Sequence, residues 1–212
     1  EGSPEQMIGD FWNSGMDTAS IESDGLKHIR PYLERIHAVQ DISGLMSLVT
    51  EFKALGSSTF FSEFVTQDDK NSEAMIYSFY QGGIGLPERA YYFKNDSATT
   101  RIRNQYADYI STILNLSGKD SVTANKSGKA ILAMETRLAK VSRKLEDLRD
   151  PYSNYNKLAI EDLNKISTLV DLPLHLKNTG VLHLDSVLVG QPEFFKGMNE
   201  VIRSTPLDVL KD

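Results

Sequence analysis

The chain has no cysteine, only four histidines and a single tryptophan among its 212 residues. Without cysteine it forms neither disulfide bonds nor thiolate metal sites. It contains no run of 18 apolar residues, so the sequence offers no membrane-spanning helix. It has 23 basic against 29 acidic residues and no basic cluster, which argues against a nucleic-acid partner. The remaining composition, 40% hydrophobic and 25% charged, is that of an ordinary globular protein with a substantial core.

Apolar residues recur at helical spacing along most of the chain. Asp41 is a candidate N-cap and Gly56 a candidate end for one helix, and Pro151 is expected to end the helix with the most regular apolar spacing. Two shorter helices are expected over residues 159–167 and from Pro192 onward. The helical stripes are Met7 and Phe11; Ile29, Leu33 and Ile36; Ile42, Leu45, Val49, Phe52 and Leu55; Ile102, Tyr106, Tyr109, Ile113 and Leu116; and Ile131, Met134, Leu138, Val141, Leu145 and Leu148.

The pattern changes near residue 58, where aromatic and branched residues gather on either side of the turn-forming segment QDDKNSE. This predicts a β-hairpin over residues 58–81, and residues 181–191 read as a further strand or extended run. We therefore predict a mainly α fold, a bundle-like helical lobe with a small β-hairpin, in a single domain over residues 1–212.

Motifs for metal or nucleophilic catalysis are not found. The histidines, His28, His37, His175 and His183, include no pair spaced by four and no HExxH, so structural or solvated histidines are expected. No GxSxG elbow occurs, whereas a Ser-His-Asp triad stays open because its members meet only in the fold.

The sequence motifs also give little support for nucleotide binding. The GGIG stretch lacks the third glycine of a dinucleotide-binding loop, and Gly128-Lys129 is followed by Ala130 instead of serine or threonine. We assign no catalytic, cofactor-binding or metal-binding residue to this chain.

The segment QGGIGLPERAYYF, from Gln81 to Phe93, combines glycines, which give the backbone conformational freedom, with aromatic side chains. It allows two interpretations. It is either a phosphate-binding loop or a structural corner. The corner is favoured: glycines permit conformations that a Cβ opposes, and Pro87 fixes the direction. Tyr91, Tyr92 and Phe93 are then expected to anchor it in the core.

The same segment resembles the GLGLPxRDYY signature of the neprilysin and endothelin-converting-enzyme family of zinc metallopeptidases, which includes bacterial oligopeptidase O. Ala90 departs from that signature, Gly15 stands where animal members have cysteine, and Leu158-Ala159 replaces Met-Thr at a possible helix cap. Other segments that resemble the family, in the family's order, are residues 11–36, 68–87, 149–163 (with Arg149, Asp150, Pro151, Tyr155, Asn156 and Lys157) and 187–195.

The resemblance implies that the catalytic groups lie elsewhere. In this family an HExxH motif and a later glutamate hold zinc towards the C-terminus, where an Asn-Ala pair and a histidine also act; none of these occurs here. The chain therefore resembles the non-catalytic N-terminal lobe. In such enzymes this lobe caps the catalytic lobe and encloses a chamber that admits small or flexible peptides.

Several expectations follow from that resemblance. The parent protein would be a zinc metalloendopeptidase with zinc outside this stretch, with peptides and the catalytic lobe as partners, and exported, periplasmic or at the cell surface. We expect its sequence to continue beyond Asp212. The alternative is a complete helical module that binds peptides or proteins without catalysis.

Overall fold

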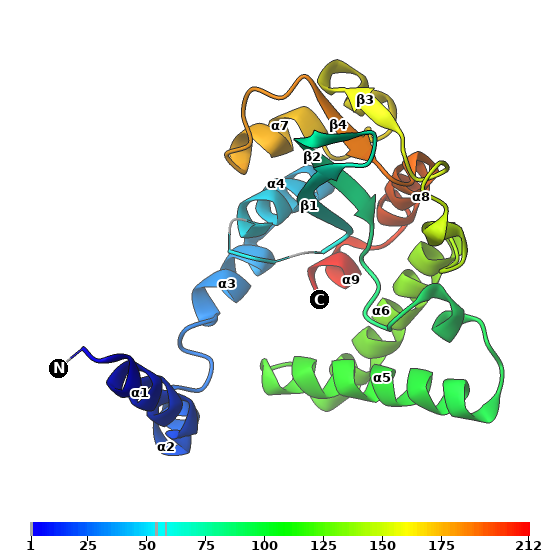
Figure 1. The fold of residues 1–212 in the computed structure, drawn as a ribbon. Coiled ribbons are helices and arrows are strands. Elements are labelled where there is room, and N and C mark those ends of the chain that lie inside the picture. The colour runs from blue at the N-terminus through cyan, green and yellow to red at the C-terminus, as the bar shows by residue number, and fades with distance from the viewer. Residues whose placement is uncertain (1, 54, 58) are drawn as a thin grey trace. The chain divides into compact units, whose positions relative to one another are not determined.

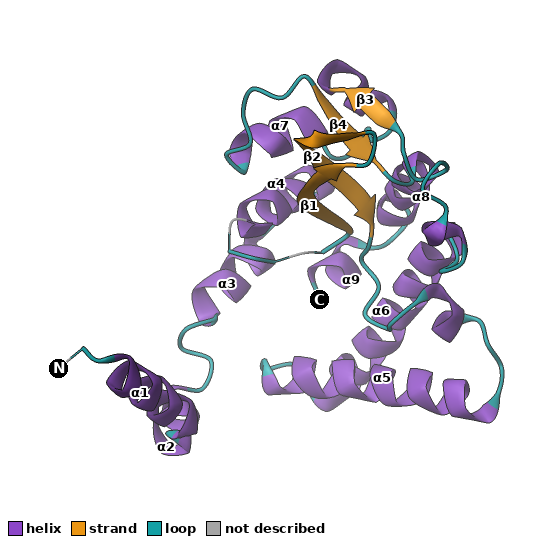
Figure 2. Cartoon of the chain, in the orientation of Figure 1, coloured by secondary structure: helices purple, strands orange, loops and turns teal. Residues whose placement is uncertain are grey.

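The computed structural model describes residues 2–53, 55–57 and 59–212. The chain divides into two compact units, residues 1–38 and residues 39–212. Figure 1 colours the elements from blue at the N-terminus to red at the C-terminus, and Figure 2 distinguishes helices from strands. The expected single domain over residues 1–212 stays a prediction.

The first unit consists of helices α1 (Pro4–Met16), α2 (Thr18–Asp24) and α3 (Arg30–Ala38). Ser3 caps α1 and Asp17 caps α2, because each side chain accepts a hydrogen bond from the amide three residues ahead, at 3.3 and 3.1 Å. Helix α1 ends one residue beyond Gly15, and Pro31 is the second residue of α3, close to the predicted boundaries. None of the residues in these three helices is fully buried.

The second unit contains a four-stranded sheet in the order β1-β2-β4-β3. Strands β1 and β2 form an antiparallel hairpin in which Phe61 faces Gln81, while β4 runs parallel to β2. A hairpin is thus present over 61–81, and the predicted start at Ser58 lies outside the described residues. The strands are β1 (Phe61–Asp68), β2 (Asn71–Gln81), β3 (Lys157–Ala159) and β4 (Ser186–Val189).

Helices make up most of the rest of this unit, so the mainly helical class is confirmed. They are α4 (Ile42–Lys53), α5 (Ser97–Leu116), α6 (Ser121–Val141), α7 (Leu172–Asn178), α8 (Pro192–Arg203) and α9 (Leu207–Lys211), with 3₁₀ turns η1 (Arg89–Tyr92), η2 (Asp147–Arg149) and η3 (Ile160–Lys165). Figure 2 shows helices around the sheet. The second unit is therefore a small sheet covered by helices, not the predicted bundle, because β3 and β4 extend the hairpin.

The main core lies where α8 packs against the sheet. Phe194 and Phe195 of α8, Phe79 of β2 and Leu138 of α6 are all fully buried. The rings of Phe79 and Phe195 meet edge to face, with centroids 6.2 Å apart. Such pairs contribute about 0.5–1.5 kcal/mol beyond the area they bury.

Helix α6 is shorter than its apolar stripe predicts. It was expected to continue to Pro151 but ends at Val141, where Ser142 is extended (ψ 147°). The Arg143 amide donates to Gln81 Oε1 at 2.8 Å, and its guanidinium binds Glu193 at 2.5 and 3.1 Å. These contacts outweigh the local helical periodicity.

The predicted apolar face of α5 divides into two parts. Ile102 and Tyr106 pack against a small buried cluster that includes Leu86 and Tyr92. Three further members, Tyr109, Ile113 and Leu116, are exposed instead. Part of the apolar face of α5 is therefore left uncovered by the described residues of the second unit.

Candidate functional site

The signature corner, residues 81–93, leaves strand β2 and leads to α5 (Figure 1). Gly83 has φ +73°, and a Cβ there would lie 2.8 Å from the carbonyl oxygen of Phe60. At Gly85 a Cβ would collide with the hydroxyl of Tyr106. Both positions need glycine, as predicted, because one backbone is left-handed and the other is closely approached.

We expect Gly83→Ala to lower the free energy of unfolding by about 2 kcal/mol, from strain at positive φ and crowding. Gly118→Ala is the matched control, because Gly118 has φ +109° but nothing within 4 Å of an added Cβ. Urea unfolding of both variants separates the two causes. Equal losses would show that the contact with Phe60 contributes nothing.

Glu135 of α6 organises the corner from inside the protein. Its carboxylate accepts hydrogen bonds from the Tyr92 hydroxyl at 2.6 Å and the Tyr106 hydroxyl at 2.8 Å. The Gly85 amide donates to the same carboxylate at 3.3 Å. Because Glu135 is buried, these donors replace the water that a carboxylate would otherwise bind.

This arrangement favours a structural corner over a phosphate loop. Burial, together with the neighbouring Glu135 carboxylate, raises the pKa of Tyr92 and of Tyr106, so both phenols remain donors. The Gly85 amide, which a phosphate loop would offer to its ligand, is already used by a carboxylate. A phosphate there would meet negative charge.

The three aromatic residues of the signature behave differently from one another. Tyr92 is 5% exposed and anchors the corner as predicted, and Tyr91 is half-buried. The prediction for Phe93 is wrong, since its side chain is 39% exposed. Phe93 instead stacks beneath Arg89, whose Cζ lies 4.9 Å from the ring centroid.

The four histidines have different surroundings. His28 is exposed and lies 2.9 Å from Asp24, and His37 lies on α3. His183 is exposed with φ +60°. Only His175 on α7 is buried among these four, and sequence reasoning did not identify its partners.

His175 belongs to a buried polar network between α4, α7 and the hairpin. Its Nε2 lies 2.8 Å from Glu63 Oε2, and its Nδ1 lies 2.9 Å from Thr50 Oγ1. Tyr77 donates to the same carboxylate at 2.7 Å. Burial alone would raise the pKa of Glu63, but hydrogen bonds from His175 and Tyr77 outweigh it and hold that pKa below its ordinary value.

The Thr50–His175–Glu63 chain has the outline of a nucleophile–histidine–acid triad. Thr50, however, is itself buried, and its hydroxyl oxygen also lies 3.1 Å from the Met46 carbonyl oxygen within α4. A catalytic hydroxyl must reach a substrate, whereas Thr50 is enclosed, so the geometry of this network is that of a contact that supports the fold.

Asp68, at the tip of β1, forms a third buried carboxylate cluster, after those of Glu135 and Glu63. Lys157 pairs with it at 2.8 Å, and the Tyr155 hydroxyl donates to it at 2.8 Å. Both partners belong to the RDPxxxYNK block, which therefore ties the hairpin tip to β3. The hydrogen bond from Lys157, with others from the Lys70 amide and Tyr155, lowers the pKa of Asp68 to about 2.

Asp68→Asn is expected to make stability less dependent on pH. A carboxylate with a lowered folded pKa stabilises the fold above its unfolded value, and this contribution is lost as pH falls through the folded pKa. The stability difference between the native chain and Asp68→Asn should thus be largest above pH 4 and shrink towards about pH 2. Asp69→Asn, at the exposed neighbouring position, is the control. Parallel curves for all three proteins would contradict the assignment.

The departure at Leu158-Ala159 has the structural outcome that the sequence predicts. Ala159 is the N-cap of η3 and makes no side-chain capping hydrogen bond. Asn156, also from the block, donates to the Gly190 carbonyl at 3.2 Å. The block thus acts through the side chains of Tyr155, Asn156 and Lys157.

The resemblance places zinc outside this stretch of sequence. Within residues 2–53, 55–57 and 59–212, no group of three or more histidine, aspartate or glutamate side chains is placed to hold a metal ion.

Comparison with known proteins adds sequence relatives. The profile of Peptidase family M13 matches residues 1–212. Endothelin-converting enzyme-like 1 of Rattus norvegicus is 28% identical over 233 residues, which cover 99% of this chain and 29% of the relative. Neprilysin-3 of Drosophila melanogaster is 26% identical over 144 residues, which cover 65% of this chain and 18% of the relative. The chain thus spans less than a third of these relatives' length.

Solved structures show the same fold. The Mycobacterium tuberculosis zinc metalloprotease Zmp1, in complex with an inhibitor, superposes with a TM-score of 0.88 at 24% identity, over 99% of this chain and 32% of that one. PepO from Lactobacillus rhamnosis HN001 gives 0.72 at 16% identity, over 89% and 30%. Since the family profile covers all 212 residues, the chain belongs to peptidase family M13.

Proposed function

We propose that this chain is the non-catalytic N-terminal lobe of a neprilysin-like zinc metalloendopeptidase. The observation that carries the proposal is the difference in length between this chain and its relatives. The family profile takes up the whole chain, yet Endothelin-converting enzyme-like 1 is matched over only 29% of its length. Peptide cleavage, and the zinc that polarises the scissile carbonyl and activates water, then belong to the remaining part of the parent protein.

The proposed role of the lobe is to enclose a chamber and to restrict substrates to small or flexible peptides. Exposed apolar side chains support a covering role, because large apolar patches on soluble proteins mark interaction surfaces. On α1, Phe11 is 82% exposed and Trp12 67% exposed. In the second unit, Leu116 of α5 is 67% exposed. We propose that these faces contact the rest of the parent protein.

We also propose that the parent protein acts outside the cytoplasm, in the periplasm or at the cell surface, on peptide substrates. Among the helices of the described residues, none has the length and apolar character needed to cross a bilayer. Fractionation of the source cells with an antibody against this chain tests the compartment.

The test of function compares the 212-residue chain with the protein encoded by the complete reading frame. We expect the complete protein to contain zinc and to cleave a short fluorogenic peptide but not a folded protein. The 212-residue chain should contain no stoichiometric zinc and cleave neither. Tight stoichiometric zinc or peptidase activity in the shorter chain would refute the proposal. A complete protein that cleaves folded substrates equally well would refute only the size restriction.

The reading frame itself decides between this function and a stand-alone binding module. A frame that continues beyond Asp212 into an HExxH sequence supports the peptidase lobe. A stop codon directly after Asp212 would support the stand-alone module.

A further inference from the structure

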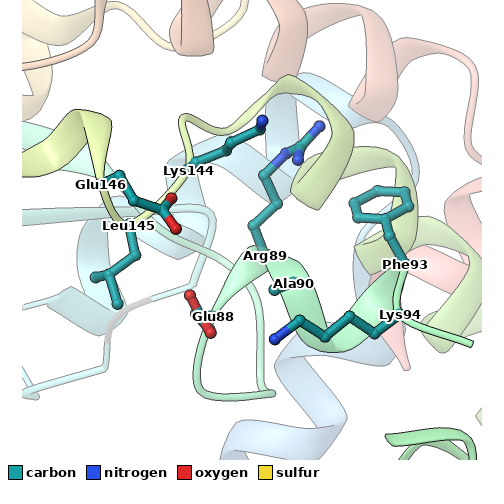
Figure 3. A pocket seen from close by; sticks show the side chains of 8 residues that line it. All are labelled: Glu88, Arg89, Ala90, Phe93, Lys94, Lys144, Leu145 and Glu146. Carbon is teal, nitrogen blue, oxygen red and sulfur yellow. The ribbon is translucent and has the colours of Figure 1, made fainter. Parts of the chain in front are cut away.

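A hollow of about 280 Å³ lies beside the signature corner, between η1 and the turn that follows α6. Three cationic side chains line it, those of Arg89, Lys94 and Lys144 (Figure 3). Two carboxylates, Glu88 and Glu146, also line it. The described residues of the hollow thus carry a formal net charge of +1 at neutral pH.

Arg89 is the unusual residue of this hollow. Its Nε is buried and has no hydrogen-bond partner among the described residues. Its recorded contact is with the ring of Phe93, at 4.9 Å from Cζ to the centroid. A guanidinium remains charged at any physiological pH and presents donors in a fixed fork, so an unused N–H edge is a costly feature to retain.

The charged residues around Arg89 bear on what could bind to its unpartnered Nε. In Figure 3 the side chains of Arg89 and Lys144 both extend toward the upper part of the view, and the Glu88 carboxylate lies below them. Within the described part of the chain, no ion pair joins either side chain to Glu88 or Glu146. Two cations that line one hollow without an ion pair to its carboxylates repel one another, and an anion bound there would offset that repulsion.

We propose that this hollow binds the carboxylate group of a small organic molecule or peptide end, held by Arg89 and Lys144. A carboxylate matches the guanidinium fork, and its single charge matches the net charge of the hollow. A phosphate dianion would place more negative charge beside Glu88 and Glu146. Phe93 and Leu145 offer apolar contact for the body of the ligand. This proposal does not depend on the proposed peptidase function.

Titration of the ¹⁵N-labelled chain, followed by NMR, tests the proposal. The probes are propionate, N-acetyl-leucine, its uncharged amide N-acetyl-leucinamide, and inorganic phosphate. We expect saturable shifts of the Arg89 Nε–H resonance and of the Ala90 and Leu145 amides with propionate, N-acetyl-leucine or both. The amide should cause none. A response to N-acetyl-leucine alone identifies a peptide C-terminus as the source, and an equal response to propionate identifies small free acids.

Variants show whether the contact is the one proposed. Arg89→Lys keeps the charge but removes the fork, and should weaken binding at least about tenfold at the Ala90 and Leu145 amides. Lys144→Gln should weaken it several-fold. Matched controls are Arg101→Lys on α5 and Lys140→Gln on α6, both exposed, which should leave affinity unchanged. Equal shifts with the amide, saturation by phosphate alone, no saturable shift, or unchanged affinity in Arg89→Lys would each overturn the proposal.

Discussion

Glu135→Ala is expected to lower the free energy of unfolding by about 3–5 kcal/mol, because three hydrogen-bond donors lose their shared buried acceptor. The substitution leaves the hydroxyls of Tyr92 and Tyr106 and the amide of Gly85 without their acceptor. Each buried donor that loses its partner costs about 1–3 kcal/mol. Chemical denaturation followed by far-UV circular dichroism measures the loss, since the single tryptophan, Trp12, lies on an exposed helix of the other unit.

Two comparisons show whether the loss comes from the hydrogen bonds. Lys129→Ala, on the exposed side of the same helix, should change stability by about 0.5 kcal/mol or less. Tyr92→Phe should cost more than Tyr106→Phe, because the Tyr92 hydroxyl also accepts a hydrogen bond from the Leu86 amide at 3.0 Å. A Glu135→Ala variant as stable as the native chain would show that the corner holds without its carboxylate.

The helices of this protein could be predicted because their signals are local. The carboxylate of Asp41 accepts from the Gly44 amide at 2.7 Å at the start of α4, as its N-cap position predicts. Pro192 begins α8, where its missing N–H costs nothing. The hairpin was visible in the same way, from aromatic runs around a polar turn. In each of these cases the residues that decide the structure are neighbours in sequence.

The end of α6 could not be predicted, because residues far away in sequence decide it. Gln81 is 62 residues from Arg143, and Glu193 is 50 residues from it. The apolar stripe continues through Leu145 and Leu148, so periodicity alone favours a longer helix. Only the fold shows that the Arg143 amide bonds to Gln81 instead of continuing the helix.

The sequence pattern did not predict the buried carboxylates for the same reason, although each lies among apolar positions. Glu135 stands next to Met134 in the stripe of α6, and Glu63 lies two residues from Phe61, on the same face of β1. A carboxylate among core positions requires buried donors, which predicts a network but not its members. His175, the partner of Glu63, is 112 residues away.

Truncation of either partner of the Glu63–His175 pair should be about as costly as Glu135→Ala. The side chain of Glu63 is 3% exposed and that of His175 1% exposed. Either Glu63→Ala or His175→Ala therefore removes a hydrogen-bond partner from a buried polar group. We expect each to lower the free energy of unfolding by about 3–5 kcal/mol. The double variant should cost less than the sum, with a coupling of about 0.5–3 kcal/mol. Additive losses would contradict direct coupling.

Acid provides an independent test of the same pair. The hydrogen bonds to Glu63 hold its pKa below 4.5, so its contribution is complete above that pH and is lost as the pH falls through the lower, folded value. Glu63→Gln keeps the shape of the side chain but does not titrate. Its stability should therefore lie furthest below that of the native chain above pH 4.5 and approach it in acid. The exposed Glu73→Gln, on β2, should follow the native curve throughout. If the Glu63→Gln curve instead runs parallel to the native one, Glu63 supports the hairpin through its shape and not through its charge.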